Sequence, residues 1–405
     1  MMGLRRAEIG IVVAGLTVTI GCWLLFRPWD TAGFMIGVPF GRDFVNFWIS
    51  PRLALDGRAD VITDLPAYGA VIRETFRLAH DPGLLFVYPP HTLLFLVPFA
   101  LLPFWAAAIA WAGLNLAALA ATFRLIVPPD EERARTLLIV TLASPPAAAM
   151  VMYGHFGGLI ALAGTLAILE SERRPWLAGL CLACLSVKPQ FASVLGLILL
   201  CGGRWRWLPS AILATLALAA LSVTAFGFGP WERFVLVTLP LQSAYIADFK
   251  ASVISTCISV YFALRFLGAP AALAWAAQGA VTLFALAAAV LTLRGRSEAP
   301  RALLVILLAA IVALPYASHY ELAIVAPALT FVVFARERGG AAAPFAAAAW
   351  ILAPLAKLLY LLGLPILSLT TVAALVEQAL RSRPGMRGAR APVGNRVRVT
   401  IPGMR

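Results

Sequence analysis

Charged side chains are scarce in this sequence: they make up 13% of its 405 residues, whereas soluble proteins average about 25%. Apolar residues make up 61%, and a mean hydropathy of +0.89 over the whole length shows that the excess is not confined to one anchor. The scarcity of charge excludes a secreted soluble enzyme, a disordered scaffold and a water-soluble DNA-binding domain. The sequence is that of an integral membrane protein.

Acidic residues are fewer than basic ones, 19 against 32, which leaves a net charge of +13. Such a charge is often a sign of nucleic-acid binding, but seven arginines lie between residues 381 and 405, where there is no acid. This segment carries about half of the excess. We therefore expect residues 1–380 to form one membrane domain, residues 381–405 to be a disordered cytoplasmic tail near anionic lipid heads, and no nucleic acid to bind.

Cysteine is also rare, and the five cysteines lie in or beside apolar runs. Cys181 and Cys184 form a CxxC inside an apolar helix, where packing is a simpler role than metal or redox chemistry. The sequence has no metal-ligand spacing, no glycine-rich phosphate loop and no Ser-His-Asp order. We accordingly expect no metal and no cofactor.

The apolar segments predict an all-α polytopic membrane protein. A spanning helix needs roughly 20 apolar residues, and basic residues mark its cytoplasmic end. The stretch from Arg5 to Phe26 lacks a small-residue cleavage site, so we interpret it as a retained first helix rather than a signal peptide. Full-length apolar segments occupy residues 7–26, 86–102, 104–127, 207–226, 270–293, 300–317, 318–335, 343–359 and 361–377.

Two further apolar regions are too long for one crossing and are broken by Pro or Gly. We expect residues 136–170 to make one net crossing, and residues 176–201 to form a hairpin of short helices with Lys188-Pro189 at its outer apex. About 12 transmembrane crossings follow, with both termini cytoplasmic. The nearly neutral stretch 128–135 then lies outside.

Three parts of the chain face outward in this topology: the loop 27–85, the segment 227–269 and the junction from Tyr316 to Glu321. The loop holds seven of the 19 acidic residues. Apolar residues recur at helical spacing over 44–55 and 65–78, which predicts amphipathic helices on the membrane surface.

Ionisable groups near membrane depth are costly and are therefore functional candidates. Asp43, next to Arg42, precedes Phe44, Phe47 and Trp48, whose low dielectric would adjust its pKa as a general base. The alternative is an ordinary helix N-cap, since Asp before an apolar-periodic stretch is a common capping signal. One residue can do both.

Lys188 interrupts the apolar hairpin beside Pro189 and Gln190. A lysine at a helix break suits an anionic group such as phosphate, although its side chain could instead reach the membrane surface.

Several other polar residues lie near expected helix ends, and each has a structural alternative. His319, Tyr320 and Glu321 could bind phosphate or sugar, or cap a helix. His155 could line a pocket or bridge packed helices. Tyr88 and His91 flank two prolines that a helix start explains by itself. Asp248 and Lys250 could simply pair with each other.

In their order along the chain, these residues resemble glycosyltransferase family 87, the polyprenol-phosphate-mannose-dependent mannosyltransferases of the GT-C superfamily. The resemblance covers roughly residues 10–375. It rests on Asp43 after the first helix, Tyr88-Pro89-Pro90, Ser144-Pro145-Pro146 before Tyr153-Gly154-His155, Lys188-Pro189, and the run from Pro315 to Tyr320.

The resemblance implies a GT-C type fold, Asp43 as the catalytic residue, and a polyprenyl-phosphate-sugar donor. The acceptor would be a lipid-linked molecule or a glycan at the outer face of the cell membrane. Donor phosphate would meet Lys188, His319 and Arg42. The pocket would be lined by Tyr88, His91, His155, Gln190, Tyr320 and Glu321. Membrane lipids are then expected partners, and no protein partner is required.

A lipid or sugar transporter is the main alternative, because it too would have many helices and few buried charges. The chain has no internal repeat of the kind that marks inverted transporter halves. The uneven layout, with one long outer loop early in the chain, favours the enzyme.

Overall fold

The computed structural model describes residues 4–27, 41–127, 131, 133–247, 256–295, 298–334 and 343–382. These residues form helices joined by turns, with one isolated bridge between Cys257 and Ser318. The all-α expectation is confirmed. The tail beyond 382 and the pair Asp248 and Lys250 lie outside the described residues.

Six helical segments are long and apolar enough to cross a membrane, which confirms a polytopic membrane protein. They are α1 (Arg6–Phe26), α5 (Phe104–Ile126), α6 (Ala134–Leu142) with α7 (Pro145–Tyr153), α11 (Leu208–Phe226), α16 (Ala271–Arg294), and α19 (Pro344–Leu352) with η4 (Ala353–Leu355) and α20 (Ala356–Leu361).

Shorter apolar helices pack among these. They are α8 (Gly157–Glu170), α9 (Pro175–Leu185), α10 (Pro189–Cys201), α17 (Ala299–Val312), η3 (His319–Val325) and α18 (Ala326–Phe334). The remaining elements are α2 (Arg42–Leu55), η1 (Ala59–Thr63), α3 (Leu65–Phe76), α4 (Thr92–Ala100), α12 (Gly229–Arg233), η2 (Phe234–Thr238), α13 (Leu239–Ala247), α15 (Val260–Phe266) and α21 (Ile366–Arg381).

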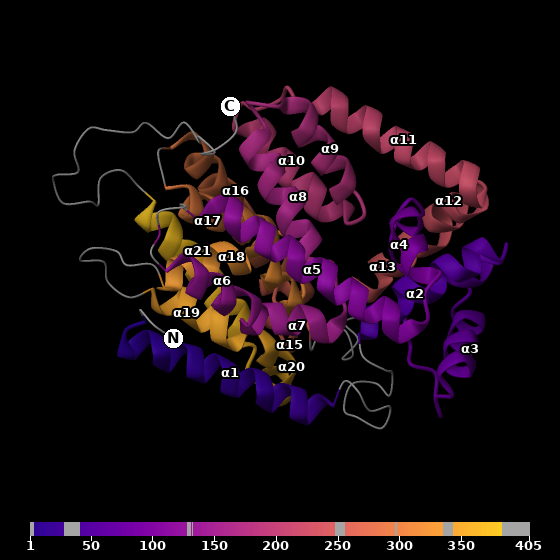
Figure 1. The fold of residues 1–405 in the computed structure, drawn as a ribbon, viewed down its shortest axis with the longest axis horizontal. Helices are drawn as coiled ribbons and strands as arrows, with labels where there is room; N and C mark the ends of the chain where they lie inside the picture. Colours follow the sequence, from indigo (N-terminus) through magenta and orange to yellow (C-terminus); the bar gives the residue numbers. More distant parts are fainter. Residues whose placement is uncertain are drawn as a thin grey trace.

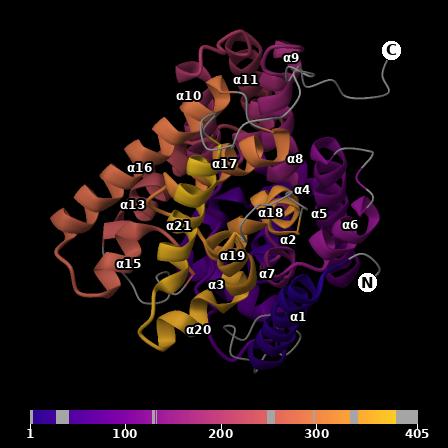
Figure 2. The same ribbon diagram turned by 90° about the vertical axis from the view of Figure 1, so that its left-hand side faces the viewer.

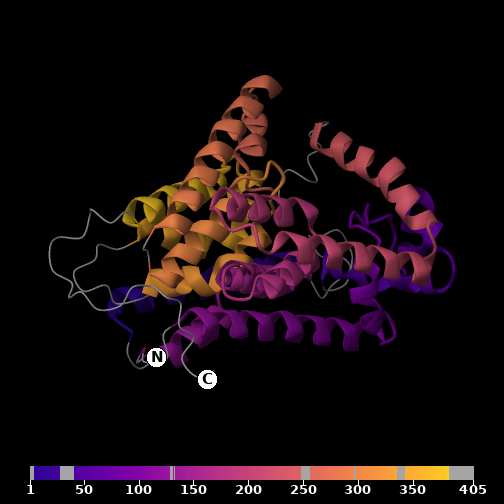
Figure 3. The ribbon, with the colours of Figure 1, turned by 90° about the horizontal axis from the view of Figure 1, so that it is seen from above.

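The short helices gather at one end of the bundle. Figure 1 shows α2, α3, α4 and α12 together on the right, whereas α1 begins at the opposite end. Figures 2 and 3 show α16 and α15 projecting away from the body of the bundle. On α11, Ala211 and Ser222 alone are buried. An apolar helix that is this exposed is stable only against lipid, so the exposed face of α11 faces the membrane.

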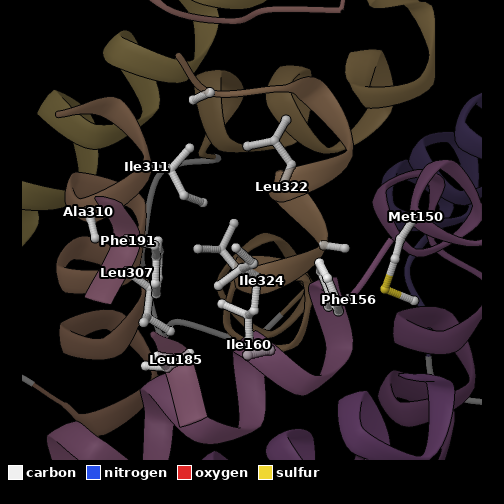
Figure 4. Close-up of a cluster of buried hydrophobic side chains, with 14 of the residues drawn as sticks. Met150, Phe156, Ile160, Leu185, Phe191, Leu307, Ala310, Ile311, Leu322 and Ile324 are labelled. Atoms are coloured by element: carbon white, nitrogen blue, oxygen red, sulfur yellow. The ribbon is translucent and has the colours of Figure 1, made fainter. Parts of the chain in front are cut away.

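The core lies between the α9–α10 hairpin and η3. Figure 4 shows side chains from α8, α9, α10, α17 and η3 packed there, and all of those named here are buried: Ile160, Leu185, Phe191, Leu307, Ile311, Leu322 and Ile324. This packing matters for the site because the hairpin turn carries Lys188 and η3 carries Glu321.

The amphipathic segments of the first loop do form helices, α2 and α3, but α2 does not lie on a surface. Ten of its 14 residues are buried. Phe47 packs against Phe156, with ring centroids 4.4 Å apart, and Trp48 meets Phe104 edge-on. Aromatic side chains of this size bury most area between packed helices, so α2 sits inside the bundle end and brings its first turn with it.

One predicted crossing is wrong. Residues 86–102 contain only the nine-residue α4, which packs on α2 and is too short to span. Residues 136–170 hold one candidate span, α6 with α7, followed by the shorter helix α8, because the chain turns at Gly154 between α7 and α8. The turn is held by α5: the Trp111 indole donates to the Gly154 carbonyl, 2.9 Å. The total of 12 crossings stays a prediction.

Of the stretch 128–135, the structure describes Glu131 and residues 133–135. Arg133 is buried and pairs with Glu8 at the start of α1, Nη1 to Oε2 2.9 Å. It also donates to the Phe334 carbonyl at the end of α18. The pair places Arg133 at the same end of the bundle as the start of α1, which disagrees with the alternation of crossings that placed it at the other end.

Candidate active site

A cavity of about 420 Å³ lies between α2, the α9–α10 hairpin turn and η3. Eight of the ten predicted site residues line it: Arg42 and Asp43 from α2; Tyr88 from the segment before α4; His155; Lys188 and Gln190 from the hairpin; Tyr320 and Glu321 from η3. The cavity reaches the surface beside Gly83 and the start of α10, because Gly83, Pro189 and Gln190 are all lining and exposed.

Two glycines allow α2 to approach the α7–α8 turn. Gly41, before α2, has φ +78°, and Gly154, after α7, has φ +69°. A Cβ on Gly154 would lie 2.6 Å from the Phe44 Cβ and 3.1 Å from the Gly41 Cα. Both the left-handed conformation and the close contact therefore require glycine. The approach places Asp43 and His155 on the same cavity.

Asp43 is not the N-cap of α2, because Gly41 occupies that position. Its carboxylate lies 4.0 Å from Arg42 Nη1 and accepts a hydrogen bond from the Tyr320 hydroxyl. Burial raises the pKa of Asp43, while Arg42, Tyr320 and Lys188 oppose that rise without cancelling it. A carboxylate whose pKa is raised toward neutrality is a better general base than an ordinary aspartate.

Lys188 occupies the N-cap position of α10, with Pro189 at the first helical position. The helix dipole there favours anions, and the Lys188 side chain is 6% exposed, with its ammonium paired with Glu321. Burial lowers the pKa of Lys188 to about 7, although the Asp43 carboxylate favours its charged form. The hairpin predicted over 176–201 is thus present, with its turn at the cavity.

Tyr88 and His155 form a polar pair within an aromatic wall. Tyr88 Oη lies 3.3 Å from His155 Nε2, and the His155 ring lies 4.5 Å from the Tyr320 ring. Burial lowers the pKa of His155 well below its ordinary value, with Lys188 adding to the effect. His155 is therefore neutral and offers one nitrogen as donor and one as acceptor.

The structure does not bring His91 or His319 to the cavity. His91 hydrogen bonds to the Ser186 hydroxyl through Nε2, 2.9 Å, and stacks on Trp231. The His319 side chain is fully buried and meets Tyr153 edge-on. His91 contacts the hairpin turn without lining the cavity, and His319 packs behind Tyr320.

Several lining residues were not foreseen. Asn46 follows Asp43 by three positions, so helical spacing could have placed it on the same face. Its amide donates to the Leu85 carbonyl, 3.1 Å, and Gln242 donates to the Val87 carbonyl, 2.6 Å. These two amides hold the extended segment 82–87 as a cavity wall. No local pattern marks Gln242, which comes from α13, or Tyr316 and Thr256.

The arrangement combines a carboxylate, an ammonium and hydrogen-bonding walls on one cavity. Among the described residues no group of three His, Cys, Asp or Glu side chains is placed to hold a metal ion. A carboxylate and an ammonium on one enclosed cavity can remove a proton from a nucleophile and stabilise a departing phosphate.

Comparison with protein families matches residues 86–316 to the model of glycosyltransferase family 87. Comparison with curated proteins and with solved structures found no match. The matched region is more than half of the chain and includes Tyr88, His155 and Lys188, while Asp43 precedes it and Glu321 follows it. This membrane protein therefore belongs to glycosyltransferase family 87 and is a glycosyltransferase.

Proposed function

We propose that the protein is an inverting glycosyltransferase that moves a hexose, mannose, from a polyprenyl-phosphate donor to a lipid-linked or glycan acceptor. The supporting observation is that Asp43 and Lys188 line the same cavity at the end of a membrane bundle. A transporter needs no base near a phosphate-binding cation, so the presence of both residues favours transfer chemistry over the movement of lipid or sugar.

The reaction follows from the positions of the charges. Asp43 removes the proton from an acceptor hydroxyl as that oxygen bonds to the anomeric carbon. The bond from that carbon to the phosphate oxygen breaks, through an oxocarbenium-like transition state. The leaving polyprenyl phosphate keeps the electron pair, and Lys188 and Arg42 stabilise its charge. Attack opposite to the leaving group inverts the anomeric centre.

A lipid-borne donor fits the way the cavity opens. Pro189 and Gln190 are exposed at its mouth, where the N-terminus of α10 attracts anions. The helices of the bundle present exposed apolar side chains to lipid, including Leu213 and Leu216 of α11. The phosphate of a polyprenyl donor can meet Lys188 while its chain remains in the bilayer.

The same proposal places the active site at the outer face of the cell membrane. The start of α1 would then be cytoplasmic, as would the Arg204 cluster, in which Arg204 bonds to Ser171 and to the Leu293 carbonyl. Basic residues at these ends follow the positive-inside rule.

We expect a cysteine at position 60 to react with an impermeant thiol reagent from outside, and a cysteine at 295 to react only after the membrane is opened. Asp60 and Gly295 are both exposed, so access rather than burial decides the result. The five native cysteines are first replaced by serine or alanine, because Cys201 is itself exposed. The reverse labelling pattern would contradict the outward orientation.

We expect a bell-shaped dependence of donor kcat/KM on pH. The rate rises with pH as Asp43 loses its proton, which happens above the range of an ordinary aspartate because its pKa is raised. It falls through about pH 7 as Lys188 loses its proton. Lys188→Arg keeps its charge at any accessible pH, so this variant should lack the alkaline fall. If the alkaline fall is unchanged in Lys188→Arg, Lys188 is not the group that binds the phosphate.

A further inference from the structure

Within the part of the chain that the structure describes, Glu321 uses only one of its two carboxylate oxygens. Oε1 pairs with Lys188, whereas Oε2 is buried and has no hydrogen-bond partner among the described residues. The side chain is 2% exposed and lines the cavity. A buried carboxylate oxygen without a donor costs free energy, and because Glu321 lines the cavity, a group that binds there with the substrate can supply the missing donor.

We propose that Glu321 is a specificity-determining residue: Oε1 holds Lys188 toward the donor phosphate, and Oε2 accepts a hydrogen bond from one hydroxyl of the transferred hexose. The inference rests on the proposed function, since it assumes that a glycosyl phosphate occupies the cavity. It adds to that function a contact that recognises the sugar itself.

The chemistry of the group restricts its partner to a hydrogen-bond donor. An ionised carboxylate only accepts hydrogen bonds, and it repels the oxygens of a phosphate. The ammonium that could neutralise it is already bound at Oε1. Of the parts of a polyprenyl-phosphate-hexose, only the sugar hydroxyls donate hydrogen bonds.

The position of Glu321 agrees with a sugar contact. The transferred sugar must lie between the base and the leaving phosphate, that is, between Asp43 and Lys188. Glu321 contacts Lys188, and its neighbour Tyr320 hydrogen bonds to Asp43. The backbone of this segment is anchored, because the Glu321 N–H donates to the Ser318 carbonyl, 2.9 Å, and Ser318 pairs with Cys257 in a β-bridge. A hydrogen-bond acceptor that is fixed in place can distinguish one hydroxyl position of the sugar from another.

The test compares donors that lack one hydroxyl each. Short-chain polyprenyl phosphates carrying the hexose, or its 2-, 3-, 4- or 6-deoxy form, are supplied to the full chain in lipid vesicles. Losing a hydrogen bond to a charged group should lower kcat/KM of the wild-type protein for one deoxy donor by roughly 10- to 100-fold. In Glu321→Gln, which keeps the size of the side chain, that penalty should shrink at least about tenfold.

A matched control is Glu8→Gln. Glu8 is also 2% exposed and also pairs with a buried basic residue, Arg133, but it does not line the cavity. Its deoxy-donor pattern should equal that of the wild type. If Glu321→Gln folds poorly, Glu321→Met serves as a second variant, and the same penalty is expected to be absent in it.

The outcomes separate the inference from the proposed function. If no deoxy donor loses more than a few-fold in the wild type, or if the penalty survives in Glu321→Gln, Glu321 does not read the sugar and the inference is overturned. If the wild type transfers no hexose from any polyprenyl phosphate, the proposed function itself fails.

Discussion

Asp43→Asn is expected to lower sugar transfer by about 10³-fold or more while leaving the chain folded in the membrane. General-base catalysis contributes about 10²–10⁴-fold in typical enzymes. The amide has the shape of the carboxylate and can still accept the Tyr320 hydrogen bond, but it cannot take the acceptor's proton. The buried first turn of α2 therefore keeps its packing and loses only its base.

The measurement is single-turnover transfer from a polyprenyl-phosphate-mannose donor in vesicles, with binding of unglycosylated polyprenyl phosphate measured in parallel. Transfer should collapse and phosphate-lipid binding should persist. Asp64→Asn is the matched control in the same loop, because Asp64 caps α3 through the Ala67 N–H and asparagine caps equally well. Retained turnover in Asp43→Asn would sink the mechanism, and transport without transfer would favour the transporter.

The second large effect is expected from Lys188→Met. Removing a preorganised charge that stabilises a leaving group typically costs about 10²–10³-fold in rate. This substitution also leaves Glu321 buried without its partner, and breaking a buried ion pair from one side costs about 3–5 kcal/mol. We therefore expect both a lower thermal unfolding temperature in detergent and a loss of donor kcat/KM.

The double variant Lys188→Met, Glu321→Gln separates these two effects. It removes both charges, so the unfolding temperature should return toward that of the wild type, whereas transfer should stay low because no ammonium meets the phosphate. Restored transfer in the double variant would show that Lys188 acts only by neutralising Glu321. Lys188→Arg should keep much of the activity.

Local patterns were enough to predict several elements of the site. The apolar run after Arg6 gave α1, and the break at Lys188-Pro189 gave the α9–α10 hairpin with its basic turn. Both depend on short-range chemistry: the length of an apolar run, and the loss of a helical N–H at proline. Asp43 was recognisable as a candidate because it is a charged residue followed closely by aromatic ones, Phe44, Phe47 and Trp48.

The predicted details failed where the answer depended on contacts between distant segments. Arg133 was placed outside by the alternation of predicted crossings, whereas its pairing with Glu8, 125 positions away, puts it at the same end of the bundle as the start of α1. His319 was grouped with Tyr320 and Glu321 because they adjoin in sequence. Successive residues of η3 point in different directions, so Glu321 faces Lys188 while His319 packs behind Tyr320 against Tyr153.

The scarcity of charge was enough by itself to identify a membrane protein, because such apolar helices are insoluble in water and need a bilayer around them. It also singled out the few ionisable groups that could do chemistry. Which of them meet was decided only by the tertiary structure. The contact of Gly41 with Gly154 brings Asp43 of α2 to the α7–α8 turn, and the packing of the hairpin on η3 brings Lys188 to Glu321. These contacts join segments more than 100 residues apart, and the free energy that selects them comes from burying whole faces, which no local pattern records.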